Sequence, residues 1–130
     1  MIKTAFLQMA VLCGLLAAPG FCAAQGQPPI EIWLSQRMGR WGDYYFYALG
    51  GKSTHPTPKG TFTVKSKYVD FYSRKYKSPM PLSVFFTDQC AIHVGSLRVS
   101  SHGCIHVDGE AAQFIFGYAV PGRTKVRVYP

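Results

Sequence analysis

Hydrophobic and polar residues alternate along much of the chain beyond residue 29, with the period of two that is typical of half-buried strands. The alternation is clearest over residues 61–66 and 125–129, and each is predicted to be a strand. The apolar run 30–34 and the aromatic run 43–49 are predicted to pair as a hairpin around a polar, glycine-bearing turn at 35–42. This pattern indicates a sheet rather than a helical bundle.

Two more strands are predicted at 82–86 and 90–94, and residues 103–107 lead into another. The segment 68–81 differs, because it mixes aromatic and basic residues with two prolines and has no clear period. It is predicted to be a long loop, which in a compact domain is often a lid or a binding loop. A solvated basic surface is the alternative.

One short segment favours a helix near the C-terminal end of the chain. Asp108 can cap its first turn, which also contains Glu110, and Pro121 with Gly122 would stop it. Its buried side is expected to consist of Phe114, Ile115 and Tyr118. Many short strands with one helix predict a mainly β domain, a sandwich or a barrel-like fold, without internal repeats.

The first residues have the layout of a secretory signal peptide, with Lys3, a mostly apolar run over 5–18 and small residues up to Ala24. The apolar run is too short to span a bilayer, and an uncleaved amphipathic anchor is the alternative. No later stretch is apolar for long enough, so no transmembrane anchor is expected after cleavage. The predicted organisation is a signal peptide at 1–24, a short disordered lead at 25–29 and one domain at 30–130.

The formal net charge of +8 favours acidic partners. Export makes nucleic acid an improbable partner, whereas cell-wall peptides with free carboxylates would fit. Signal cleavage would remove Cys13 and Cys22 and leave Cys90 and Cys104. These two could form a single disulfide, but the setting of Cys104 between Gly103 and Ile105 is unusual for a structural bridge.

The densest group of reactive side chains lies at residues 100–107, with His93 eleven residues upstream of Cys104. A thiol needs a nearby base to become a strong nucleophile at neutral pH, so Cys104 is predicted to be the nucleophile and His93 its acid–base partner. Attack on a carbonyl would give a thioester through a thiolate–imidazolium pair. Cys90 is interpreted as an ordinary buried thiol.

Backbone amides are the predicted stabilisers of the oxyanion that such an attack creates. Gly103 permits a tight turn that would aim the N–H groups of His102, Gly103 and Cys104 inward. No acidic residue stands near His93 in sequence, so a backbone carbonyl, that of Val94, is expected to orient its ring.

The run Ser101-His102-Gly103-Cys104, together with Ile92-His93, resembles the active-site signature of the L,D-transpeptidase catalytic domain, the YkuD-like family. Residues 55–62 (His-Pro-Thr-Pro-Lys-Gly-Thr-Phe) resemble the family's Pro-Thr-Pro-x-Gly turn, and 32–35 resemble its opening strand. The resemblance covers residues 30–129, nearly all of the predicted mature chain.

The resemblance implies a β-rich exported enzyme of the periplasm or cell envelope that needs no cofactor or metal. Its substrate would be a peptidoglycan stem peptide, cleaved after the L-centre of a diamino acid and joined to an amine. The acceptor could be a second stem peptide, an envelope lipoprotein, an amino acid or water. Ser101, His102 and Gly103 would shape the site around Cys104 and His93.

Two features depart from the family pattern. The family usually has Arg or Asn two residues after the cysteine, where this chain has His106, and the stretch from His93 to Ser101 is short. His106 could contact a substrate carboxylate, or it could pack on the strand face that points away from the cleft.

Three other readings use the same residues. His93, His102, Cys104 and His106 could bind zinc, although their spacing matches no common zinc motif. The domain could bind wall peptides without catalysis. The same chemistry with water as acceptor would make an L,D-carboxypeptidase or amidase.

Overall fold

The computed structural model describes residues 26–130. The predicted signal peptide, 1–24, and Gln25 of the predicted lead lie outside the described residues. In the rest of the lead, the Gln27 side-chain amide donates to the Tyr118 carbonyl (2.7 Å), and the Pro28 carbonyl accepts from the Trp41 indole (2.8 Å). Within residues 26–130, no helix is long and apolar enough to cross a membrane.

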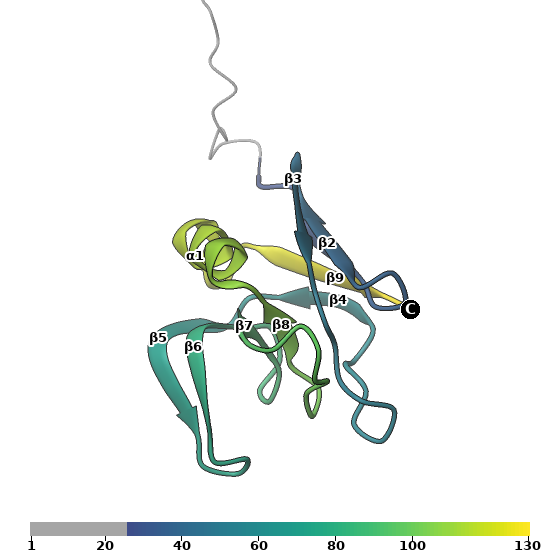
Figure 1. Ribbon diagram of the computed structural model, residues 1–130. Helices are drawn as coiled ribbons and strands as arrows, with labels where there is room; N and C mark the ends of the chain where they lie inside the picture. The colour runs from purple at the N-terminus through teal and green to yellow at the C-terminus, as the bar shows by residue number, and fades with distance from the viewer. Residues whose placement is uncertain (1–25) are drawn as a thin grey trace, which may run out of the picture.

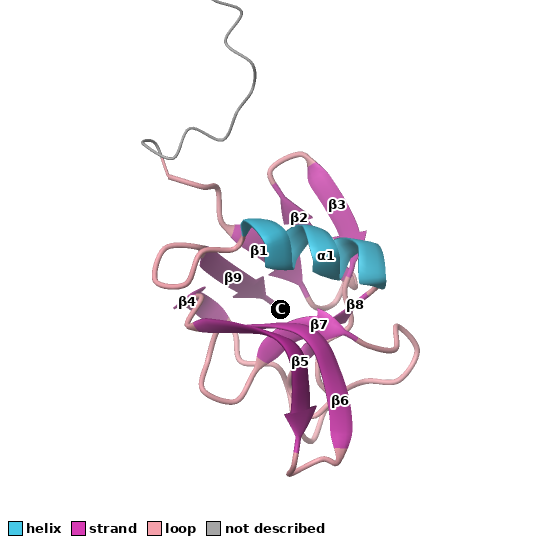
Figure 2. Ribbon diagram, turned by 90° about the vertical axis from the view of Figure 1, so that its left-hand side faces the viewer, coloured by secondary structure: helices cyan, strands magenta, loops and turns pink. Residues whose placement is uncertain are grey.

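The described chain forms two β-sheets and one helix, as Figures 1 and 2 show. The first sheet has the order β3-β2-β1-β9-β4, with bounds Tyr44–Tyr47, Met38–Trp41, Ile30–Trp33, Lys125–Tyr129 and Gly60–Thr63. The second has the order β5-β6-β7-β8, with bounds Ser66–Ser73, Ser78–Phe85, Ala91–Val94 and Ile105–Val107. The helix α1 spans Gly109–Tyr118. The mainly β prediction with one short helix is confirmed.

The core is built from the inward residues of both sheets and one side of α1. Strand alternation buries Ile30 and Ile32 from β1 and Val126 and Val128 from β9, and the second sheet and α1 add Val84, Ile92, Ile105, Val107 and Ile115. Each such side chain contributes about 1.5–3 kcal/mol when fully buried. Phe114 of α1 packs on Trp41 and Tyr44, so the helix contacts the first sheet as well as the second.

The predicted turn at 35–42 is wrong, because residues 38–41 form β2. The aromatic strand β3 pairs with β2, and β2 separates it from β1. The reason is Gly39, which occupies an inward position opposite Phe46 and has no side chain to signal burial. The actual turn is tighter and uses Arg37 in a left-handed conformation, with φ 53°.

The predicted long loop at 68–81 is also wrong, because this segment belongs to the β5–β6 hairpin. Pro79 and Pro81 made a strand prediction unfavourable, because proline has no N–H to donate within a sheet. They are tolerated here because β7 pairs with β6 only at Val84 and Phe85, which leaves the proline-bearing half of β6 at a sheet edge.

The helix begins as predicted, with the Asp108 carboxylate accepting from the Ala111 N–H at 2.7 Å. Its buried side is only partly as expected. Ile115 is buried, but Tyr118 is 53% exposed and the remaining buried helix residues are Ala111 and Ala112. Small residues let α1 approach the sheet closely, so the larger aromatic side chains sit at its margin.

Two glycines make a matched test of this packing. In Gly39→Ala, the new Cβ would meet the Phe46 ring at 2.3 Å and Ile32 at 2.9 Å, so we expect a loss of about 1–3 kcal/mol of stability from overpacking. In Gly117→Ala, on the exposed side of α1, the Cβ meets nothing within 4 Å, and better helix propensity should add about 0.5–1 kcal/mol. Urea unfolding measures both, and equal effects of the two substitutions would contradict the inward placement of Gly39.

Candidate active site

The two faces of the second sheet have different roles. Ile92 and Ile105 are register partners on the core face of the parallel β7–β8 pair. His93 and His106 are register partners on the other face, and Cys104 precedes Ile105 by one residue. Because side chains alternate along a strand, Cys104, His106 and His93 all lie on the face away from the core.

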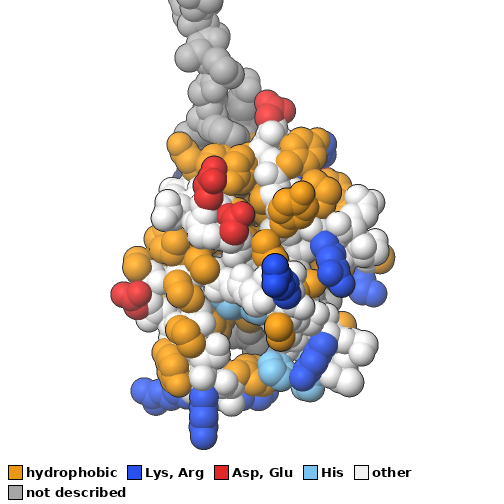
Figure 3. Space-filling view, in the orientation of Figure 1, with side chains coloured by type: hydrophobic (Ala, Val, Ile, Leu, Met, Phe, Trp, Pro, Cys, Tyr) orange, Lys and Arg blue, Asp and Glu red, His pale blue; other side chains and the backbone are white. Residues whose placement is uncertain are grey.

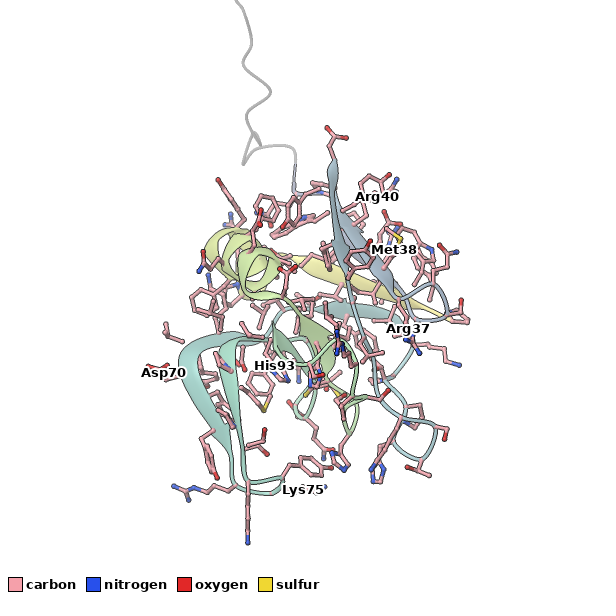
Figure 4. All side chains as sticks on the ribbon, viewed as in Figure 1. Arg37, Met38, Arg40, Asp70, Lys75 and His93 are labelled. Carbon is pink, nitrogen blue, oxygen red and sulfur yellow. The ribbon has the colours of Figure 1, made fainter. Side chains whose placement is uncertain are left out.

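These side chains line one cavity of about 650 Å³. Figure 3 shows it as a hollow bordered by histidine side chains, and Figure 4 places His93 beside β7 and β8. The cavity lining also includes the apolar side chains Met80 and Phe85 of β6. The cavity is large enough for part of a peptide and holds apolar and hydrogen-bonding groups together.

His93 is fixed in one tautomer. Its Nδ1 lies 2.8 Å from the Val94 carbonyl oxygen, which can only accept, so Nδ1 carries the proton and Nε2 has a free lone pair. This confirms the expectation that the Val94 carbonyl orients the ring. The pKa of His93 is lowered to about 4, mainly because burial penalises the imidazolium; the Val94 carbonyl opposes the shift and His106 adds to it.

Cys104 is a free thiol that immediately precedes β8. Its Sγ accepts from the Ala91 N–H at 3.5 Å, and burial raises its pKa, with the nearby Cys90 adding to the rise and the Ala91 contact opposing it. Cys90 is also free, so the structure does not contain the single disulfide considered from sequence. Both directions favour the neutral form, a thiol at Cys104 and an imidazole at His93.

The turn from Ser101 to Cys104 is held by its own serine. The Ser101 hydroxyl accepts from the Gly103 N–H (3.1 Å) and donates to the Cys104 carbonyl. Gly103 has φ 123°, a conformation that disfavours any side chain. The Gly103 N–H, expected from sequence to stabilise an oxyanion, is therefore already occupied. Among residues 26–130, no acceptor is found for the N–H groups of His102 and Cys104.

His102 and His106 occupy opposite parts of the site. His106 donates from Nδ1 to the Ser96 carbonyl (2.8 Å), and its ring meets the His93 ring edge-on at 4.9 Å, so the alternative that it points away from the cleft is wrong. His102 is exposed and stacks on Tyr76, with ring centroids 4.1 Å apart. Desolvation lowers the pKa of His102, and Lys52, His55 and Lys75 add to this.

Sequence reasoning did not identify Tyr76 as a site residue. It lies in the turn of the β5–β6 hairpin, and its stacking on His102 links that turn to the segment that carries Cys104. Lys75, labelled at the same turn in Figure 4, also lines the cavity. The only signal in the sequence was the basic and aromatic composition of the segment, which suggested a binding loop.

No group of three or more His, Cys, Asp or Glu side chains is arranged to hold a metal ion in the part of the chain that the structure describes. Of the four residues considered for zinc, His102 lies with Tyr76 and His55 at the rim, whereas His93 and His106 contact each other.

A family model described as the L,D-transpeptidase catalytic domain matches residues 31–128. No curated protein sequence matches the chain. Similar solved structures include an L,D-transpeptidase from Xylanimonas cellulosilytica DSM 15894, with TM-score 0.71 and 21% identity over 80% of this chain and 61% of that one. Another, from Mycobacterium tuberculosis H37Rv, has TM-score 0.67 and 24% identity over 78% and 57%.

A third is L,D-transpeptidase 3 from Mycobacterium tuberculosis in complex with a faropenem-derived adduct, with TM-score 0.66 and 21% identity over 78% and 59%. At these identities the likeness shows the shared fold. The chain spans less than two thirds of the length of each of these three structures.

The neutral resting pair predicts how Cys104 reacts with iodoacetamide. Because its pKa is raised, the thiolate fraction at neutral pH is small and grows about tenfold per pH unit. In Cys90→Ser protein, where Cys104 is the reporter, the alkylation rate should climb through neutral pH and keep climbing beyond about pH 8.5, the value for an ordinary thiol. Intact-protein mass spectrometry measures the rate. A plateau reached near pH 6 would instead indicate a thiolate–imidazolium pair.

Proposed function

Because the chain belongs to the L,D-transpeptidase catalytic domain family, we propose that it is an L,D-transpeptidase that acts on peptidoglycan stem peptides in the cell envelope. Cys104 is the nucleophile and His93 the acid–base group. One observation carries this assignment: His93 in β7 and Cys104, which directly precedes the neighbouring parallel strand β8, line one cavity. The Val94 carbonyl engages Nδ1 of His93, and Nε2, which has no partner among residues 26–130, is left to take a proton.

The reaction begins with a stem peptide whose scissile carbonyl lies over Cys104. His93 Nε2 takes the thiol proton as sulfur attacks the carbonyl carbon, and the carbonyl oxygen becomes an oxyanion. The intermediate collapses, the C–N bond breaks, and His93 returns the proton to the leaving amine. A thioester on Cys104 remains. The acceptor amine then attacks the thioester, loses its proton to His93, and releases the thiol.

The N–H groups of His102 and Cys104 are the donors for the oxyanion. Neither has an acceptor among the described residues, and the Gly103 amide between them is held by Ser101. A preorganised amide pair stabilises charge that develops only in the transition state, so it lowers the barrier without requiring a charged resting site.

The net charge of +8 and the basic hairpin turn suit a substrate with free carboxylates. Arg74 and Lys75 line the cavity where such a peptide would enter. The acceptor can be a second stem peptide, an amino acid, an envelope lipoprotein or water, and the last would make the protein an L,D-carboxypeptidase.

The direct test incubates the protein with a tetrapeptide muropeptide, with and without an amine acceptor, and identifies products by mass spectrometry. Wild type and Cys90→Ser should form the transfer product, whereas Cys104→Ala and Cys104→Ser should lose about a thousandfold or more of the rate. Hydrolysis without transfer would identify a carboxypeptidase. Binding without turnover would identify a non-catalytic wall-binding module and refute the proposal.

His106 is the residue where this chain departs from its family, and its place in the cavity makes it a candidate contact for a substrate carboxylate. Its Nδ1 is engaged by Ser96, so Nε2 is the atom available to a ligand. The His106 ring faces His93 edge-on and contributes to lowering the pKa of His93.

Histidine loses its positive charge within the physiological pH range, whereas arginine keeps its charge. If His106 binds a carboxylate, the Michaelis constant of wild type should rise as pH increases from about 5 to 8. In His106→Arg it should stay low over the same range. Steady-state kinetics with a muropeptide measure both curves. Parallel curves for the two proteins would show that His106 does not contact the substrate carboxylate.

A further inference from the structure

Behind the Ser101–Cys104 turn lies a hydroxyl that the reaction itself does not use. Thr57 is 1% exposed, and its Oγ1 accepts from the Gly51 N–H at 2.8 Å and donates to the Gly103 carbonyl at 2.9 Å. The side chain thus joins a segment 46 residues upstream to the residue just before Cys104. Thr57 is absent from the cavity lining, so it does not contact the site where substrate would bind.

The segment that includes Gly51 and Thr57 runs along the back of the turn; we refer to residues 49–57 as the strap. The Lys52 N–H donates to the Ser101 carbonyl at 3.0 Å, and Leu49 exchanges two hydrogen bonds with His106. A Cβ on Gly51 would lie 2.8 Å from the Gly103 nitrogen, so strap and turn are in direct backbone contact.

The strap therefore holds two carbonyls of the turn, those of Ser101 and Gly103. The described residues contain no cis peptide bond, and in a planar trans peptide the C=O and the following N–H point in opposite directions. With both oxygens turned to the strap, the N–H groups of His102 and Cys104 point to the other side. Within the Ser101–Cys104 turn, these two amides are the ones for which no acceptor is found among residues 26–130.

We propose that Thr57 is a positioning residue, which turns the Gly103–Cys104 peptide group so that the Cys104 N–H faces the reacting carbonyl oxygen. This proposal rests on the proposed function, because it requires an oxyanion at Cys104. Ser101 holds the Gly103 N–H and the Cys104 carbonyl. The peptide group between Gly103 and Cys104 lies between the two groups that Ser101 holds. Its one side-chain hydrogen bond among the described residues comes from the Thr57 hydroxyl.

Two reactions of the same thiol separate orientation of the amide from nucleophilicity of the sulfur. Acylation of Cys104 by a carbapenem β-lactam passes through a tetrahedral oxyanion, whereas alkylation by iodoacetamide displaces iodide and forms none. In Thr57→Val, which keeps the volume and removes the hydroxyl, the acylation rate should fall by about tenfold or more, while the alkylation rate changes by less than about twofold. Thr57→Ser should restore most of the lost acylation.

Thr124→Val is the matched control. Thr124 is also 1% exposed and its hydroxyl also bridges two groups, the Val120 N–H and the Gln27 side chain, but it does not line the cavity. Its ratio of acylation to alkylation should equal that of wild type even if its stability is lower. Thr57→Ala also lacks the hydroxyl and should show the same fall in the ratio of acylation to alkylation. It serves as the test variant if Thr57→Val does not fold.

An unchanged ratio in Thr57→Val or Thr57→Ala would overturn the positioning role. An equal fall in Thr124→Val would also overturn it, because the effect would then follow general destabilisation. Failure of the proposed function gives a distinct result, in which wild type is alkylated at Cys104 but is never acylated. That result would also overturn the positioning role of Thr57.

Discussion

The parallel pairing of β7 with β8 is the interaction on which the whole site depends. It places Ile92 against Ile105 in the core and, one residue on, His93 against His106 in the cavity. A shift of either strand by one residue would exchange its faces, burying polar side chains and exposing isoleucine. The hydrophobic core therefore fixes the register of the reactive residues, and the same alternation that stabilises the domain positions Cys104.

Burial decides the protonation of the site. Desolvation raises the pKa of Cys104 and lowers that of His93, so both effects favour uncharged groups before substrate binds. The His106 ring, 4.9 Å from that of His93, further opposes an imidazolium there. A neutral His93 needs only a fixed ring orientation. The Val94 carbonyl provides that orientation, so no acidic side chain is required for it.

The sequence predicted those parts of the molecule whose signal is local. The predicted strand at residues 125–129 and the Asp108 cap are confirmed. The strand that contains His93 lies beside the strand that follows Cys104, which is the arrangement that the predicted pair requires. It failed where tertiary contacts override the local pattern, as at Gly39, which is buried without a hydrophobic side chain. Thr57 and Tyr76 were missed for a related reason, since their roles arise from contacts with residues 46 and 26 positions away.

The strap explains why the turn before Cys104 contains a glycine and is faced by another. Gly51 and Gly103 approach so closely that a Cβ on Gly51 would lie 2.9 Å from the Gly103 Cα, and on Gly103 it would lie 3.2 Å from the Cys90 sulfur. Direct backbone contact lets main-chain groups and the hydroxyls of Ser101 and Thr57 fix the turn. Since each held carbonyl dictates the direction of the next amide, the two N–H groups proposed to stabilise the oxyanion are oriented from behind the turn, by Lys52 and Thr57, which do not line the cavity.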